Sequence, residues 1–256
     1  MTDSHHQPAL SNEQIESVIA LYSLGHYQEV LDQIKVLNET YPNVPLLFNL
    51  VGACYKALGR LKEAAKMFET AVNIKPDYAE AHKNLGITLK EFGEFEAAIA
   101  SLKKAILIDS DYVDAHYNLA ITLKDFDQLN DAVNSYKRVL EINPNFAEAH
   151  NNLGNVFKDL EQLDEAVKSY KMAISCNQNL SDPHYNLGVT LKKLRQLDGA
   201  VQSLNNSIII KPDFANAHNN LGSCFILLGQ MTSAIECYEK AIEIKHDYAE
   251  AHNNLG

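Results

Sequence analysis

Four columns of polar side chains run through this sequence at a spacing of 34 residues, and the acidic column alone is interrupted, at Asn216. One column is asparagine, whose amide offers both a hydrogen-bond donor and an acceptor. A second is histidine, which can carry protons or bind metal ions. The other two are acidic and basic, so they could recognise a charged ligand. The columns therefore suggest hydrogen bonding to an extended chain, metal binding or charge recognition.

Each column has five or six members. The asparagine column comprises Asn84, Asn118, Asn152, Asn186, Asn220 and Asn254. The histidine column comprises His82, His116, His150, His184, His218 and His252. The lysine column comprises Lys56, Lys90, Lys124, Lys158 and Lys192. The acidic column comprises Glu80, Asp114, Glu148, Asp182 and Glu250.

Hydrogen bonding to a polypeptide is the chemistry that the asparagine column supports best. A regular row of amides can pair with the backbone of an extended chain without reading its side chains. The alternative is that the asparagines cap helices or bridge adjacent ones, which would make the column structural. We favour a ligand-competent polar face, because the spacing is unbroken from Asn84 to Asn254.

The expected distance between neighbouring histidines disfavours metal binding by the histidine column. Equivalent positions on stacked helices lie roughly 8–10 Å apart, whereas two nitrogens on one zinc must come within about 4 Å of each other. The histidines are therefore predicted to be packing residues, and no metal site is expected. His5 and His6 form too short a run to argue for one.

The charged columns have a functional and a structural explanation. Aligned lysines could line a groove for an acidic ligand. Acids near the start of a helix and lysines near its end also complement the helix dipole. Lys124 and Lys158 are followed directly by Asp125 and Asp159, which favours the structural explanation. The lysines kept as candidate groove residues are Lys90, Lys124, Lys158 and Lys192.

Motifs for catalysis are missing from the sequence. It contains no GxSxG, no phosphate-binding GxxxxGK[ST] loop and no HExxH. The chain is therefore predicted to be a binding module and not an enzyme, with no cofactor.

The spacing also identifies the elements that carry the columns. A 34-residue period is typical of stacked helical repeats, and seven repeats fill residues 11–248 without insertion or deletion. In the repeat that starts at Ala79, apolar residues recur at helical spacing on both sides of Gly93. Each repeat is therefore predicted to be two antiparallel helices. The breaks between the two helices are predicted near Gly25, Gly59, Gly93, Asp127, Glu161, Arg195 and Gly229.

The two ends differ from the repeats. Residues 1–10 are expected to be a disordered polar tail, and residues 249–256 the truncated start of an eighth repeat. Because repeat arrays normally end in a capping helix, we expect an incompletely covered apolar surface at the C-terminal end, with either self-association or fraying of residues 249–256. The residues expected to be exposed there are Ala234, Ile235, Tyr238, Ile242 and Leu255.

Small residues recur at two positions, counted from the start of each repeat. Position 8 is held by Gly52, Gly86, Ala120, Gly154, Gly188, Gly222 and Gly256. Position 20 is held by Ala64, Ala98, Ala132, Ala166, Ala200 and Ala234. This pattern resembles the tetratricopeptide repeat over residues 11–256. The resemblance implies an all-α solenoid of antiparallel helix pairs, coiled into a right-handed superhelix whose first helices line a concave groove.

The asparagine column stands at position 6, which faces that groove in the family. Its Asn-Leu-Gly pattern resembles the repeat arms of O-linked N-acetylglucosamine transferases and of bacterial glycosyltransferase or sulfotransferase proteins. In the former, such asparagines hold the backbone of a bound polypeptide. The resemblance implies a protein-interaction scaffold that binds an extended segment in its groove. The alternative is the substrate-targeting arm of a larger transferase, whose catalytic domain is absent from this chain.

Composition narrows the partners to a protein or peptide. The net charge of −11 argues against nonspecific nucleic-acid binding. There is no apolar run of about 20 residues, so no membrane span is expected. The four cysteines show no CxxC spacing and fit a reducing, cytoplasmic location.

Overall fold

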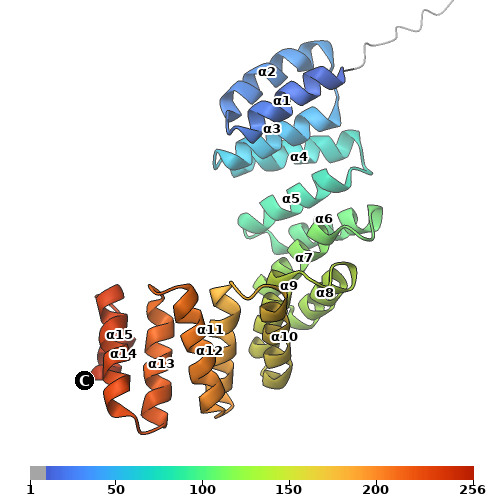
Figure 1. The fold of residues 1–256 in the computed structure, drawn as a ribbon. Coiled ribbons are helices and arrows are strands. Elements are labelled where there is room, and N and C mark those ends of the chain that lie inside the picture. The colour runs from blue at the N-terminus through green and yellow to red at the C-terminus, as the bar shows by residue number, and fades with distance from the viewer. Residues whose placement is uncertain (1–9) are drawn as a thin grey trace, which may run out of the picture. The chain divides into compact units, whose positions relative to one another are not determined.

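The computed structural model describes residues 10–256, which form fifteen α-helices and no β-strand (Figure 1). The predicted all-α class is confirmed over this range, while most of the expected N-terminal tail lies outside the described residues. The helices are α1 (Asn12–Ser23), α2 (Tyr27–Thr40), α3 (Pro45–Ala57), α4 (Leu61–Ile74), α5 (Ala79–Glu91), α6 (Phe95–Ile108), α7 (Val113–Asp125), α8 (Leu129–Ile142), α9 (Ala147–Asp159), α10 (Leu163–Cys176), α11 (Ser181–Lys193), α12 (Leu197–Ile210), α13 (Ala215–Leu227), α14 (Met231–Ile244) and α15 (Ala249–Leu255).

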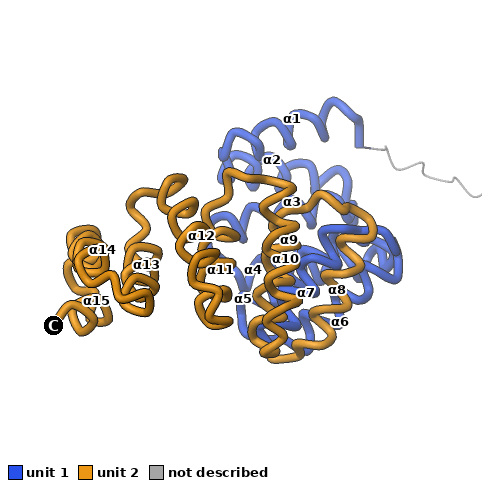
Figure 2. Tube along the Cα trace, turned by 60° about the horizontal axis from the view of Figure 1, so that its bottom comes forward, with its two compact units in different colours: residues 1–126 blue, residues 127–256 orange. Residues whose placement is uncertain are grey.

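The chain divides into two compact units between Phe126 and Asp127 (Figure 2). Unit 1 contains α1 to α7, and unit 2 contains α8 to α15. Among the described residues, no helix is both long and apolar enough to cross a bilayer. Each unit is built from antiparallel helix pairs that follow one another along the chain.

Each predicted break is a tight turn with a left-handed residue. At Glu161 the N–H groups of Glu161 and Gln162 donate to the carbonyls of Lys158 and Phe157, over 3.0 and 2.8 Å, which closes the preceding helix. The seven predicted breaks all have positive φ: Gly25 80°, Gly59 73°, Gly93 82°, Asp127 59°, Glu161 58°, Arg195 61° and Gly229 73°. The prediction of these breaks is therefore confirmed. The three non-glycine residues adopt a conformation that costs an L-residue about 1–2 kcal/mol.

Contact between the two helices of a repeat depends on its small residue at position 8. A Cβ added at Gly154 would lie 2.5 Å from the ring of Tyr170, and one at Gly52 would lie 2.7 Å from Phe68. Both rings are almost fully buried. At Gly52 and Gly154 the large residue at position 24 therefore packs directly over the glycine of its own repeat, and an added side chain would have to displace a buried ring.

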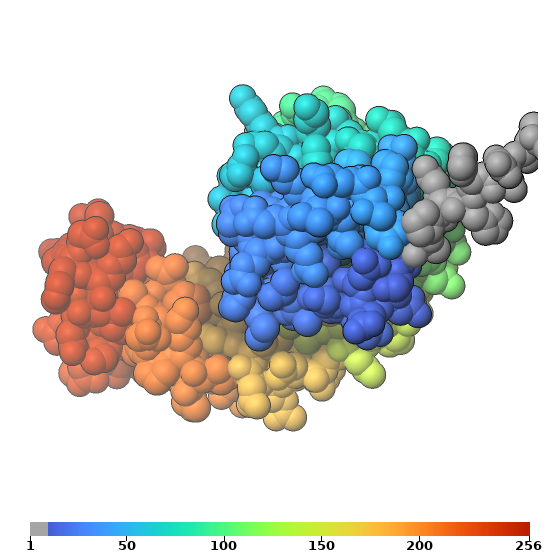
Figure 3. Space-filling view, turned by 90° about the horizontal axis from the view of Figure 1, so that it is seen from above, coloured from blue at the N-terminus to red at the C-terminus, as the bar shows by residue number. Residues whose placement is uncertain are grey.

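The first helices of successive repeats pack against one another from α3 to α7 in unit 1 and from α9 to α15 in unit 2. In unit 1, α5 packs against both α3 and α7, and in unit 2, α11 packs against α9 and α13. Second helices make no comparable contacts with each other in the described part of the chain. In the space-filling view, the dark blue side chains of α1 and α2 adjoin the lighter blue and cyan ones of α3 and α4 (Figure 3). The first helices therefore lie closer together and form the inner face of each unit.

The expectation of a broadly uncovered C-terminal helix is wrong for two of its residues. Ala234 and Tyr238 are buried, because the Tyr238 ring packs over Gly222 of its own repeat. Ile235 and Leu255 are exposed, with 40% and 37% of their surfaces accessible. Contacts within the repeat thus cover more of α14 than the sequence pattern indicated.

Candidate functional site

The asparagine column lies on the first helices, one member on each of α5, α7, α9, α11, α13 and α15. Its members are half-buried, except Asn254, which is exposed. Each stands two residues before the close-packed position 8, so the packing that fixes the helix also fixes the asparagine backbone. Consecutive members within a unit therefore recur at equivalent places on neighbouring helices.

Amide donors of this column bridge adjacent repeats. Asn84 Nδ2 donates to Asn49 Oδ1 over 3.0 Å, and Asn186 Nδ2 donates to Asn151 Oδ1 over 3.0 Å. Asn254 donates in the same way to Asn219 Oδ1, over 3.0 Å. The acceptor is always at position 5 of the preceding repeat. The bridging that the sequence left as an alternative is therefore present.

The side-chain oxygens of three asparagines in the column stay unpaired in the described part of the chain. Within residues 10–256, Asn84 Oδ1, Asn118 Oδ1 and Asn186 Oδ1 accept no hydrogen bond. The Asn118 amide donates to the carbonyl of Asp114 in its own helix, over 2.7 Å, which also fixes its orientation. The column therefore presents acceptors that are oriented by a hydrogen bond from one amide N–H inside the protein.

Two members of the column have engaged oxygens. Asn220 Oδ1 accepts from Lys192 Nζ over 2.6 Å, and its Nδ2 donates to the hydroxyl of Tyr185 over 3.3 Å. Asn152 Oδ1 accepts from Asn151 Nδ2 over 3.5 Å. These two asparagines are therefore less available to a ligand than Asn118.

Position 5 supports the column through a second contact, with the last residue of its own repeat. Asn49 Nδ2 donates to the Tyr78 hydroxyl over 3.4 Å, and burial raises the pKa of Tyr78 to about 12. In other repeats the pair is Lys83 over the Tyr112 ring, at 5.4 Å, or Tyr185 beside Phe214, with ring centres 4.7 Å apart. The sequence analysis missed this role, although a polar or aromatic residue precedes every member of the asparagine column.

The lysine column is mostly held by neighbouring repeats. Lys56 pairs with Glu91 over 2.9 Å, and Lys90 pairs with Asp125 over 3.4 Å, so each lysine meets an acid of the following repeat. Lys124 lies half-buried on α7. Lys56 and Lys90 therefore join neighbouring repeats through ion pairs, which is a structural role other than complementing the helix dipole.

The pairing changes in unit 2, where Lys193 replaces the acid that would meet Lys158. Lys193 pairs instead with Glu161, over 2.5 Å. The structure records no ion pair for Lys158 within residues 10–256, and Lys192 bonds to an amide oxygen as described above. Lys158 and Lys192 therefore keep uncompensated charge on the inner face.

Every histidine of the histidine column contacts the turn before its own helix. His150 Nε2 lies 2.9 Å from the Pro144 carbonyl, and His116 Nε2 lies 3.0 Å from the Ser110 carbonyl. The same contact, six residues back, is made by His82, His184, His218 and His252. Among the described residues, no three metal-ligating side chains gather at one point. These histidines therefore close the turn between consecutive repeats.

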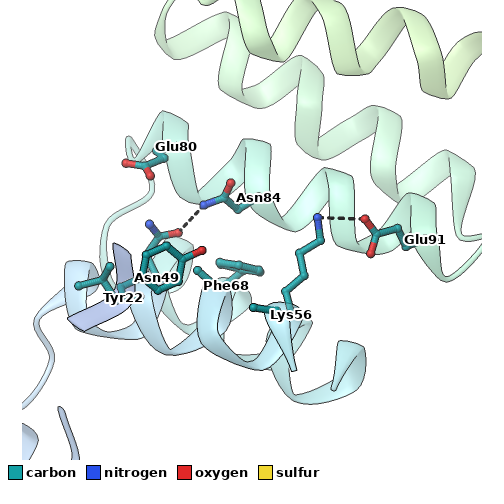
Figure 4. Close-up of a pocket in the computed structure, with 10 residues that line it drawn as sticks. Tyr22, Asn49, Lys56, Phe68, Glu80, Asn84 and Glu91 are labelled. Carbon is teal, nitrogen blue, oxygen red and sulfur yellow. Dashed lines mark hydrogen bonds and ion pairs between the residues drawn. The ribbon is translucent and has the colours of Figure 1, made fainter. Parts of the chain in front are cut away.

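An open pocket of about 550 Å³ lies beside the first bridging bond, between α1, α3 and α5 (Figure 4). Its lining includes Tyr22 and Leu50 and the Asn49–Asn84 pair. The ion pair between Lys56 and Glu91 closes one end. It is a hollow on the inner face of unit 1 that holds both apolar and polar groups.

Comparison with protein families settles what kind of repeat this is. The family described as TPR repeat matches residues 52–93, 89–125, 127–160 and 154–195, and the family described as tetratricopeptide repeat matches residues 215–248. The chain belongs to the tetratricopeptide repeat family. A tetratricopeptide repeat scaffold fits a role in protein interaction, and no catalytic domain is evident in it.

Solved structures share this fold. YrrB, described as a TPR protein with an unusual peptide-binding site, is 24% identical with a TM-score of 0.63, over 74% of this chain and 97% of YrrB. MamA is 27% identical with a TM-score of 0.61, over 65% of this chain and 97% of MamA. The C-terminal part of a TPR repeat-containing protein from Cytophaga hutchinsonii is 14% identical with a TM-score of 0.76, over 94% and 99%. No curated protein matches this chain. These tetratricopeptide repeat proteins carry no transferase description, so the likeness to transferase arms stays an expectation.

Proposed function

We propose that the inner face of each unit of this tetratricopeptide repeat protein binds an extended polypeptide through the acceptor oxygens of the asparagine column. The proposal rests on the hydrogen bonding of the Asn84, Asn118 and Asn186 side chains. One N–H of each amide donates a hydrogen bond inside the protein, while the Oδ1 atoms accept no hydrogen bond from the described residues. An oriented acceptor of this kind pairs with a backbone N–H of a ligand.

The spacing of the column suits an extended chain. Neighbouring packed helices lie roughly 8–10 Å apart, and an extended backbone rises about 3.3 Å per residue. One asparagine would therefore meet every second or third residue of the ligand. Because backbone N–H groups are the same for nearly all residues, the column would supply affinity with little sequence preference.

Substitution of the column tests the proposal. Linear peptides selected from a random library on the full chain are titrated against the variant Asn84→Ala/Asn118→Ala/Asn186→Ala by fluorescence anisotropy. Each lost hydrogen bond contributes about 0.5–1.5 kcal/mol, so the dissociation constant is expected to rise about two- to twelve-fold per bond. Circular dichroism checks that the helices persist.

A matched variant changes asparagines on second helices. The control is Asn130→Ala/Asn134→Ala/Asn205→Ala, whose side chains are exposed on α8 and α12. It is expected to bind as tightly as the parent. If the column variant also binds as tightly, or if it unfolds, the asparagine column is structural and the proposal is wrong.

A further inference from the structure

The pocket between α1, α3 and α5 breaks the regular pattern of the inner face. In the repeat that starts at Pro45, Leu50 stands where later repeats carry the asparagine column, and Ala57 stands where Glu91 and Asp125 lie. At these two positions this repeat therefore lacks the amide and the carboxylate that later repeats carry.

A small residue opens the pocket. Ala53 lines it at a position where the next two repeats carry Ile87 and Ile121. The Phe68 ring forms the floor, and it is fixed by its contact with Gly52 and only 1% exposed. The missing branched side chain leaves a hollow over a closely packed aromatic ring.

The walls are amphipathic. Tyr22 of α1 and Leu50 of α3 provide apolar surface. Burial, followed by nearby charges that include Glu80, raises the pKa of the Tyr22 hydroxyl. The Glu80 carboxylate therefore lies close enough to act on groups inside the pocket, and Figure 4 places it at the start of α5, above the Asn49–Asn84 bond.

The rim carries one uncompensated charge. Glu91 is neutralised by Lys56, over 2.9 Å. Glu80 is exposed and has no ion-pair partner within residues 10–256. A positively charged group of a ligand would find Glu80 directly beside the apolar hollow.

Resting on the polypeptide-binding function proposed above, we propose that this pocket receives a large apolar side chain of the bound peptide and that Glu80 pairs with an adjacent lysine or arginine. The Asn84 acceptor lies at the same wall and would hold the backbone between these two residues. The pocket would thus fix the register of a ligand that the asparagine column alone would let slide.

The test starts with the same random peptide library, selected on the full chain. Enriched sequences are expected to share a large apolar residue next to a lysine or arginine. One enriched peptide is then titrated against Ala53→Ile, which fills the hollow with the side chain that Ile87 and Ile121 already place at this position. Its dissociation constant is expected to rise about tenfold or more, because burial of the apolar side chain is lost.

The charge is tested separately. Glu80→Gln is expected to weaken binding several-fold at low salt, and to reduce the salt dependence of binding, since an ion pair is lost. Controls on α6 make the same chemical changes at exposed positions, Ala97→Ile and Glu96→Gln, and are expected to leave binding unchanged. Thermal unfolding of each variant establishes that it is folded.

The outcomes separate the two proposals. If no sequence is enriched above background, the peptide-binding function fails and this inference fails with it. If peptides are enriched, and weakened by the asparagine-column variant but not by Ala53→Ile or Glu80→Gln, the function stands and the pocket has no such role. If Ala53→Ile instead dissociates a dimer of this chain in sedimentation, the occupant is a second copy and the inference is wrong.

Discussion

Asn186 donates a hydrogen bond to Asn151, which lies 35 residues earlier on the neighbouring first helix, over 3.0 Å. This bond consumes a donor of Asn186 and leaves its oxygen without a partner among the described residues. One side chain therefore joins two repeats and presents an acceptor at the same time. The structural and functional explanations of the asparagine column are for this reason compatible.

Gly154→Ala is expected to lower the free energy of unfolding by about 1–3 kcal/mol, because overpacking at a close helix contact forces strain. The new Cβ would lie 2.5 Å from a Tyr170 ring that is fully buried and tied to Asn155 by a 2.9 Å hydrogen bond. Urea denaturation followed by circular dichroism measures the change.

Gly199→Ala is the matched control for this contact. Gly199 is helical, and an added Cβ would meet only the end of the Leu191 side chain, at 3.2 Å. Alanine is favoured over glycine in a helix by about 0.5–1 kcal/mol, so this variant should be neutral or more stable. Equal losses for both variants would mean that the close contact at Gly154 has no special role.

Arg195→Gly is expected to raise the free energy of unfolding by about 0.5–1 kcal/mol. Arg195 has φ 61° at the turn between α11 and α12, where glycine avoids the steric cost. Gly93→Ala tests the opposite change at φ 82°, with open space around the added Cβ, and should destabilise by about 1 kcal/mol. A destabilised Arg195→Gly would show that the arginine side chain outweighs its backbone strain.

His150→Phe is expected to destabilise the chain by about 1–3 kcal/mol, because the Pro144 carbonyl would lose its hydrogen bond at a site where His150 is 9% exposed. His26→Phe is the control, since the exposed His26 side chain contacts Glu29 of α2 and, within residues 10–256, no carbonyl of a turn between repeats. Chemical denaturation at neutral pH measures both. Loss of bound metal would accompany His150→Phe only if the histidine column were a metal site.

Cys54 and Cys237 are expected to resist alkylation by iodoacetamide in the folded chain at about pH 8. Burial raises the pKa of each thiol to about 11, so little reactive thiolate forms. Because the unfolded thiols ionise first, the folded state should lose stability as the pH rises from 9.0 toward about 11. Mass spectrometry of the labelled protein, native and in urea, measures the reactivity; equal labelling rates would contradict the burial.

Much of the fold can be predicted from the sequence, because the 34-residue period assigns each residue to a helix or a turn. Arg195 was assigned to a turn by its place in the 34-residue period, although arginine has no preference for turns, and it has φ 61°. The period fixes which helices pair, and the small residues at position 8 fix where they touch. At Arg195, position in the repeat therefore predicts the turn better than the conformational preference of the residue does.

The site was predicted less completely, because its contacts cross from one repeat to the next. The bond from Asn84 to Asn49 depends on the offset between neighbouring first helices, which no single repeat reveals. The contact from His150 to the Pro144 carbonyl likewise needs the path of the turn. The pocket at Ala53 arises from one small residue, whose effect depends on the fixed ring of Phe68.

The most direct test of the account is a double-mutant cycle between Asn118 and the ligand backbone. Asn118 is suited to it because its amide bonds only within its own helix among the described residues, so Asn118→Ala disturbs no neighbouring repeat. A selected peptide is compared with analogues in which one backbone N–H at a time is replaced by an ester oxygen, and each is titrated against parent and variant.

The account predicts one peptide position at which the ester weakens binding to the parent about two- to twelve-fold but leaves binding to Asn118→Ala unchanged, because the same hydrogen bond is already lost. Losses that simply add at every peptide position would contradict it, since Asn118 would then make no bond to the ligand backbone.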